Sequence, residues 1–134
     1  MYGHFTLALK YLRYLCTAAN GKGHGVHSPF VFEFITRVLN DRKNFYAFDA
    51  IEKIRGQLLS NHNTIEIEDF GAGSRVAKTN TRKISAVAKG SLKPAKYSQL
   101  LFRMIDFYAP TQIIELGTSL GITTAYLASA NPAA

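Results

Sequence analysis

Apolar residues recur at helical spacing through the first third of the chain. Between Phe5 and Ala19 they share one face, which predicts a helix ended by the glycines that follow. A second helix is predicted to run from Pro29 to Leu39, because Ser28 is a good N-cap and proline is favoured at the first helical position. The N-terminal region is therefore expected to be helical.

The middle of the chain mixes helical and strand-like patterns. A third helix is predicted over Asp49–Ser60, where Asp49 and Glu52 are spaced as a capping box. The residues from Thr64 to Phe70 then alternate apolar and acidic side chains, as in a strand with one wet face. Two more helices are predicted over Thr81–Lys89, stopped by Gly90, and from Pro94 to about Tyr108.

A short apolar run near the C-terminus is followed by a glycine-bracketed loop. Ile113–Leu116 has the pattern of a strand buried on both faces of a parallel sheet. Gly117 and Gly121 bracket a loop of small residues, and Ile122 begins a stretch with good helix formers. A strand, a glycine loop and a helix in this order are typical of the first βα turn of a nucleotide-binding α/β domain.

A second glycine loop competes for the same role. Asp69, Gly71 and Gly73 follow the strand-like residues 64–70. A first strand of a doubly wound sheet is covered on both faces, however, so Glu66 and Glu68 would be buried there. We therefore interpret this segment as a hairpin or loop near the site, with the cofactor loop or a substrate-pocket wall as alternatives.

These patterns define the predicted fold class and organisation. The class is α/β, with a helical N-terminal region followed by the first βα unit of an incomplete Rossmann-like sheet. The predicted regions are a helical part at residues 1–62, a mixed basic segment at 63–110, and the start of a cofactor-binding domain at 111–134.

Composition favours an ordered protein in a reducing compartment. The chain has 134 residues, 47% of them hydrophobic, with seven Tyr and nine Phe, which is enough for a packed core. Cys16 is the lone cysteine, so no intramolecular disulfide can form. Because no apolar run approaches the roughly 20 residues that span a bilayer, we expect a cytoplasmic protein without membrane association.

The positive charge is concentrated in one segment. Between Gly71 and Ile105 there are eight cations and no acid, and they exceed the net charge of +7, so the rest of the chain carries −1. The cations are Arg75, Lys78, Arg82, Lys83, Lys89, Lys93, Lys96 and Arg103. Three interpretations stay open: a solvated surface, a nucleic-acid-binding face, or a cover for the active site that includes Lys96 and Gln99.

Several motifs together resemble a known enzyme family. They are Lys96-Tyr97-Ser98-Gln99-Leu100-Leu101, then Ala109-Pro110, then Ile113-Ile114-Glu115-Leu116-Gly117. This order resembles the class I S-adenosylmethionine-dependent methyltransferases, particularly the catechol-type O-methyltransferase branch. Val26-His27-Ser28-Pro29-Phe30 and Asp69-Phe70-Gly71-Ala72-Gly73-Ser74 are similar to the N-terminal region of some bacterial methyltransferase-like proteins.

The resemblance implies S-adenosylmethionine as cofactor and assigns roles within the loop. Glu115 would be the acid that ends the first strand and pairs with the cofactor's ammonium group. Gly117 would let the chain pass the methionine portion, and Gly121 would start the helix. Thr118, Ser119 and Leu120 would line the loop, and Thr123 would meet the methionyl carboxylate.

By the same resemblance, the sequence contains only part of the expected cofactor site. In such domains the acid that holds the ribose lies ~20 residues past the loop, at the end of a second strand. We therefore expect an N-terminal fragment of a longer methyltransferase, or a truncated product, that is inactive alone. The methyl acceptor would be an oxygen or nitrogen nucleophile of a small molecule. A nucleic-acid-binding module and a catalytically silent remnant are the alternatives.

The remaining candidate chemistry is sparse. His27 is a possible general base, since its ordinary pKa of ~6.5 suits proton transfer near neutrality. No histidine spacing with Cys16 matches a metal site, so no metal is assigned. The catalytic residue stays unknown, and a homo-oligomer is possible.

Overall fold

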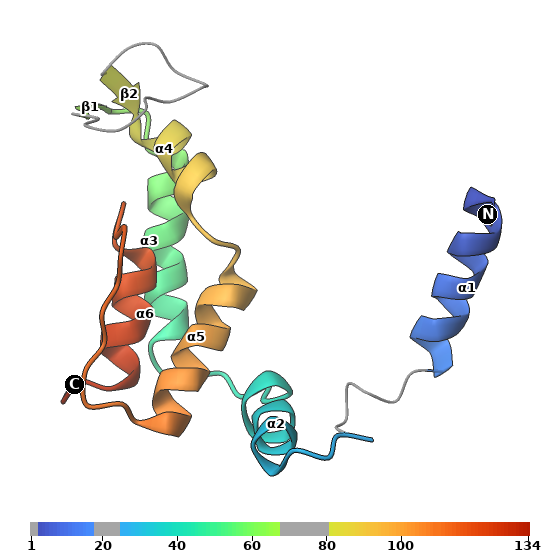
Figure 1. Cartoon of the computed structure of the whole chain (residues 1–134). Coiled ribbons are helices and arrows are strands. Elements are labelled where there is room, and N and C mark those ends of the chain that lie inside the picture. Colours follow the sequence, from blue (N-terminus) through green and yellow to red (C-terminus); the bar gives the residue numbers. More distant parts are fainter. Residues whose placement is uncertain (1–2, 18–24, 68–80) are drawn as a thin grey trace. The chain divides into compact units, whose positions relative to one another are not determined.

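A computed structural model describes residues 3–17, 25–67 and 81–134 of the chain (Figure 1). The chain divides into two compact units, residues 1–42 and 43–134, and each is described by itself. The described residues are mixed α and β and mostly helical, with a two-stranded antiparallel sheet. The α/β class predicted from the sequence is therefore confirmed at this coarse level.

The first unit contains the two helical segments that the sequence predicts. Helix α1 runs from His4 to Thr17, and all its side chains are exposed. Helix α2, Pro29–Glu33, begins as expected, because the hydroxyl of Ser28 accepts a hydrogen bond from the Val31 amide at 3.4 Å. It continues as the π-helix η2, Phe34–Leu39.

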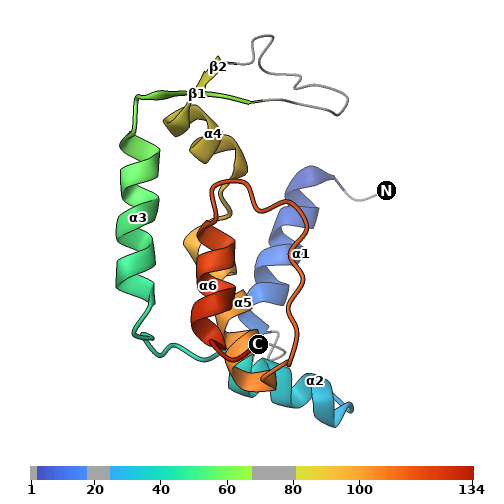
Figure 2. The same ribbon diagram turned by 90° about the vertical axis from the view of Figure 1, so that its left-hand side faces the viewer.

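The described part of the second unit contains four helices and the sheet. Its helices are α3 (Phe48–Ser60), α4 (Ile84–Ser91), α5 (Ala95–Tyr108) and α6 (Ile122–Ala130). Strands β1 (Thr64–Glu66) and β2 (Thr81–Lys83) pair antiparallel, with Ile65 opposite Arg82. Figure 2 shows the sheet at the end of α3 where α4 begins. The hairpin interpretation of the segment from Thr64 agrees with this pairing.

Two local predictions are corrected. The helix expected from Thr81 begins at Ile84, because residues 81–83 are used in the sheet, and it continues through Gly90 to Ser91. The capping box of Asp49 and Glu52 does not form, since α3 has Ala47 as N-cap with no side-chain cap. The Glu52 carboxylate instead accepts hydrogen bonds from Arg55 and Tyr126.

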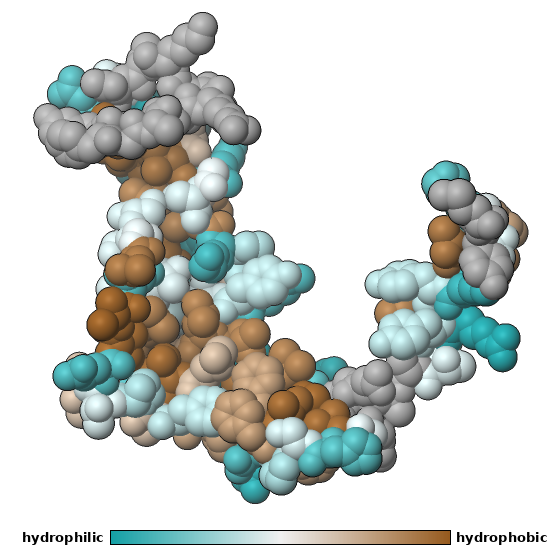
Figure 3. Space-filling model, in the orientation of Figure 1, coloured by the Kyte–Doolittle hydropathy of each residue, from teal (hydrophilic) through white to brown (hydrophobic). Residues whose placement is uncertain are grey.

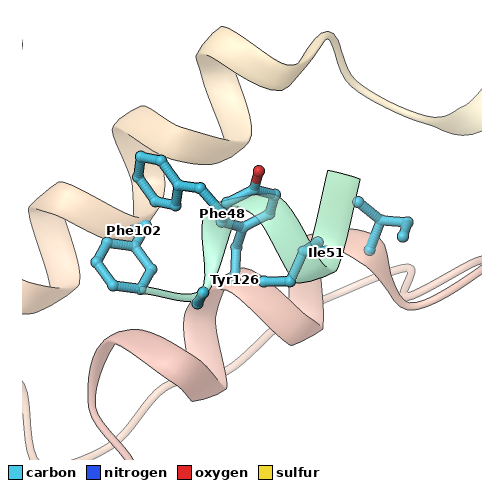
Figure 4. Packing of buried hydrophobic residues seen from close by; sticks show 6 residues of the cluster. Phe48, Ile51, Phe102 and Tyr126 are labelled. Atoms are coloured by element: carbon cyan, nitrogen blue, oxygen red, sulfur yellow. The ribbon is translucent and has the colours of Figure 1, made fainter. Parts of the chain in front are cut away.

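An aromatic cluster joins α3, α5 and α6. Phe48, Phe102 and Tyr126 are each buried, and their rings meet edge to face, with centroids 5.1 to 6.5 Å apart (Figure 4). Ile51 and Ile122 complete the buried contacts around them. Such ring pairs add about 0.5–1.5 kcal/mol each beyond the area they bury, so this cluster fixes the three helices together.

A buried polar network lies beside the rings. Arg55 on α3 donates from Nε to Glu52 at 2.9 Å, from Nη1 to the Lys93 carbonyl, and from Nη2 to the Ser98 hydroxyl at 3.3 Å. The Tyr126 hydroxyl donates to the same Glu52 oxygen at 2.7 Å. Because Arg55 is only 8% exposed, these partners replace the water that its guanidinium loses.

The predicted strand Ile113–Leu116 lies outside any helix or strand in the structure. The segment runs beside α6 in the opposite direction (Figures 1 and 2), as a strand does in a βα unit. A parallel strand exists only when a neighbouring strand bonds to it, and the described residues offer none. The Rossmann-like sheet therefore stays a prediction.

None of the helices in residues 3–17, 25–67 and 81–134 has the length and apolar content needed to cross a bilayer.

Tyr126 is expected to make the fold sensitive to alkaline pH. Burial, together with the hydrogen bond and charge of Glu52, raises the pKa of Tyr126 from 10.0 to about 12. Because the folded pKa lies above the unfolded one, this stabilisation is complete below pH 10 and is lost as the pH rises to 12. Urea unfolding should show a fall on the order of 2 kcal/mol over this range that Tyr126→Phe lacks.

Tyr97→Phe is the matched control, because Tyr97 is 50% exposed. It should retain the fall in the free energy of unfolding. An equal alkaline fall in Tyr126→Phe would contradict this role for the phenol.

Candidate functional site

A cavity of about 410 Å³ lies in the second unit at the N-terminal end of α6. Its walls come from the end of α4, from α5, from the segment before the glycine loop, from the loop itself and from the first turns of α6. The lining residues are Ser91, Leu92, Lys93, Leu101, Ile105, Ile113, Ile114, Glu115, Leu116, Gly117, Thr118, Ser119, Ile122, Thr123 and Leu127. Five of the six predicted cofactor residues therefore line one cavity, and Gly121 adjoins it as the N-cap of α6.

The loop backbone requires small residues at defined positions. Gly117 has φ +86° and Gly121 has φ +75°, both in the left-handed region that glycine adopts at little cost. Ser119 lies between them with φ +51°. A turn closes the loop, since the Gly121 amide donates to the Thr118 carbonyl at 3.1 Å. The glycine spacing read from the sequence thus has a conformational cause.

The loop leads directly into α6. Gly121 is the N-cap residue, and glycine has no side chain to bond the amides of the first turn. The partial positive charge of the helix N-terminus is therefore directed toward the loop. Thr123, in that first turn, lines the cavity.

Glu115 is held by a partner that the sequence did not reveal. The Thr124 hydroxyl on α6 donates a hydrogen bond to its carboxylate. Glu115 is half-buried and also borders a second cavity of about 210 Å³ on the side of Thr124 and Asn131. This hydrogen bond fixes the Glu115 carboxylate between the two cavities. Its donor is Thr124, the residue after the predicted cofactor residue Thr123.

Two further cavity residues come from outside the recognised motif. Ser119 in the loop donates to the Ser91 hydroxyl at the end of α4, at 2.9 Å. Lys93 lines the same cavity, while its backbone carbonyl accepts from Arg55. Sequence reasoning missed both because they lie 28 and 26 residues before Ser119; the only signal was membership of Lys93 in the basic segment.

Other predicted candidates lie elsewhere. Lys96 and Gln99 do not line the cavity: the Lys96 ammonium lies 4.8 Å from the Tyr97 ring centroid, and Gln99 bonds the phenol of Tyr126. His27 is exposed and belongs to the first unit, whereas the cavity belongs to the second. The rival loop of Asp69, Gly71 and Gly73 lies outside the described residues.

The basic segment is described in part. Arg75 and Lys78 fall outside the described residues, and Arg82 and Arg103 are half-buried. The exposed cations are Lys83, Lys89, Lys93 and Lys96. Of these four, only Lys93 lines the cavity.

Residues 3–17, 25–67 and 81–134 contain no group of three His, Cys, Asp or Glu side chains placed to hold an ion.

Comparisons with protein-family models, with curated proteins and with solved structures find no match to this chain.

Two glycines associated with helices, Gly121 and Gly56, should respond oppositely to alanine. Gly121→Ala places a side chain at φ +75°, which costs about 1–2 kcal/mol and should displace the loop. Gly56 lies inside α3 with open space around it, so Gly56→Ala should stabilise the fold by about 0.5–1 kcal/mol. Thermal and urea unfolding measure both changes, and a stabilising Gly121→Ala would contradict the loop conformation.

Proposed function

We propose that the cavity at the start of α6 binds the methionine part of S-adenosylmethionine and that the chain is the N-terminal part of a methyltransferase. The observation that carries the proposal is the convergence of the loop, Glu115 and Thr123 on one cavity. This convergence joins the family resemblance of the sequence to a concave site of suitable size for part of a small ligand.

The chemistry of the lining suits both charged ends of a methionyl group. The first turn of α6 and the Thr123 hydroxyl offer donors to a carboxylate. Glu115 offers a carboxylate to an ammonium group, and its hydrogen bond from Thr124 holds it in place. Leu101, Ile105 and Leu127 offer apolar surface to the methylene chain.

In the intact enzyme the methyl group would pass from the cofactor's sulfonium to an oxygen or nitrogen nucleophile of a small molecule in the cytoplasm. The cofactor supplies the activated methyl group. The residues present here would bind and orient it, since positioning supplies much of the rate enhancement in such displacements. No residue of this chain is assigned as the general base.

The proposal is tested by nuclear magnetic resonance titration of the ¹⁵N-labelled chain. S-adenosylmethionine and free methionine should each shift the amide signals of Gly117, Thr118 and Gly121–Thr123, and adenosine alone should not. Thr123→Val keeps the side-chain shape and removes the hydroxyl, so it should weaken binding by about 10-fold, as expected for a hydrogen bond to a charged group.

Thr64→Val is the matched control, because Thr64 is exposed on β1 and does not line the cavity. It should leave the affinity unchanged. Absence of shifts at millimolar methionine and S-adenosylmethionine, or equal weakening by the two valine variants, would overturn the proposal.

The nucleic-acid alternative predicts a different result. Binding of RNA or DNA would fall steeply with salt and would be lost when Lys78, Arg82 and Lys83 become alanine. No observation in the second unit favours it over the cavity.

A further inference from the structure

Ser119 has an unusual backbone conformation for a residue with a side chain. It is the second residue of the turn that the Gly121 amide closes on the Thr118 carbonyl, and its φ is +51°. Turns with a positive φ at this position usually carry glycine, because a side chain there is strained. Strained residues of this kind cluster at ligand sites, where the surrounding structure holds them. A side chain kept at this position points to a role for its hydroxyl.

The hydroxyl of Ser119 is bonded to the end of α4. Its oxygen lies 2.9 Å from the Ser91 hydroxyl oxygen, and the Ser91 oxygen lies 2.8 Å from the Val87 carbonyl. A carbonyl only accepts, so Ser91 donates its single proton to Val87, and Ser119 must donate its own proton to Ser91. The oxygen of Ser119 then has only lone pairs left. It can therefore bond a ligand only as an acceptor.

The cavity places a second acceptor on the same ligand site. Ser119 and Glu115 both line it, and the Thr124 hydroxyl holds Glu115. Figure 3 shows mainly apolar surface over α5 and α6, so the few polar groups of the cavity are the ones that orient a ligand. An ionised carboxylate and a hydroxyl whose proton is already used both only accept hydrogen bonds. Together they match a ligand group that is positively charged and has several N–H donors.

We propose that Ser119 is a second acceptor, beside Glu115, for the ammonium group of the methionyl ligand, and that Ser91 positions its hydroxyl. This inference rests on the proposed function. The ammonium is the donor group of a methionyl ligand, because the carboxylate and the sulfur have no proton to give. A primary ammonium has three N–H donors, so two acceptors can bond it at once. The site should therefore select ligands with a free amino group.

Two ligands that differ only in the amino group test the role of Ser119. Methionine and its deaminated analogue, γ-(methylthio)butyrate, are titrated against the ¹⁵N-labelled chain, and the ratio of their affinities measures the contribution of the ammonium. Ser119→Gly removes the hydroxyl, and glycine adopts φ +51° without strain. It should weaken methionine binding about 10-fold, as expected for a hydrogen bond to a charged group, and leave binding of the analogue unchanged.

The same ratio tests the positioning role of Ser91. Ser91→Ala removes the acceptor of the Ser119 proton and should weaken methionine binding about 3-fold, as for an ordinary hydrogen bond, without affecting the analogue. Ser91→Thr keeps a hydroxyl and should restore the ratio. Ser60→Ala is the matched control, because Ser60 also ends its helix, α3, and also donates to the carbonyl four residues earlier, but does not line the cavity. It should change neither affinity.

The outcomes separate this inference from the proposed function. The inference is overturned if the analogue binds the unsubstituted chain as tightly as methionine, or if Ser119→Gly weakens both ligands equally or neither. In those cases methionine still binds, and the proposed function stands. Equal weakening by Ser60→Ala and Ser91→Ala would overturn the positioning role of Ser91. Binding of neither ligand to the unsubstituted chain would overturn the proposed function and this inference together.

Discussion

Tyr126 is the residue on which the second unit depends, because it joins apolar packing to the polar network. Its ring meets Phe48 and Phe102 edge to face, and its hydroxyl donates to Glu52, which also accepts from Arg55. α3, α5 and α6 are fixed relative to one another through these contacts. Ile122, one helical turn before Tyr126, is buried in the same cluster, so the first turn of α6 is packed against this core as well.

The position of α6 in turn positions the candidate site. The helix places Thr123 on one cavity, while Thr124 bonds Glu115. The same guanidinium that bonds Glu52 also holds the Lys93 carbonyl, so the chain that leads into α5 is fixed at the cavity wall. The proposed ligand groups therefore come from separate segments that the network holds in place, which is the preorganisation that binding sites need.

The segment before the loop combines two properties that rarely occur together at a protein surface. Its inner residues are held on α6, and its outer residues, Ile114 and Leu116, are almost fully exposed. A strand in a sheet satisfies both faces and both edges through its neighbours.

Local sequence signals determined most helices and the composition of the loop. Ser28 and Pro29 marked the start of α2, and the spacing around Phe102 marked α5, because caps and periodicity act within a few residues. The spacing of Gly117 and Gly121 predicted the loop for the same reason, and the structure shows both glycines in the left-handed region. Only the tertiary structure decided that Glu52 accepts hydrogen bonds from Arg55 and Tyr126 instead of forming a capping box. It also decided that Thr81–Lys83 pairs with β1 and that Ser91 and Lys93 line the cavity. Those contacts join residues far apart in the sequence, and no local pattern encodes which distant partner is close enough to bond.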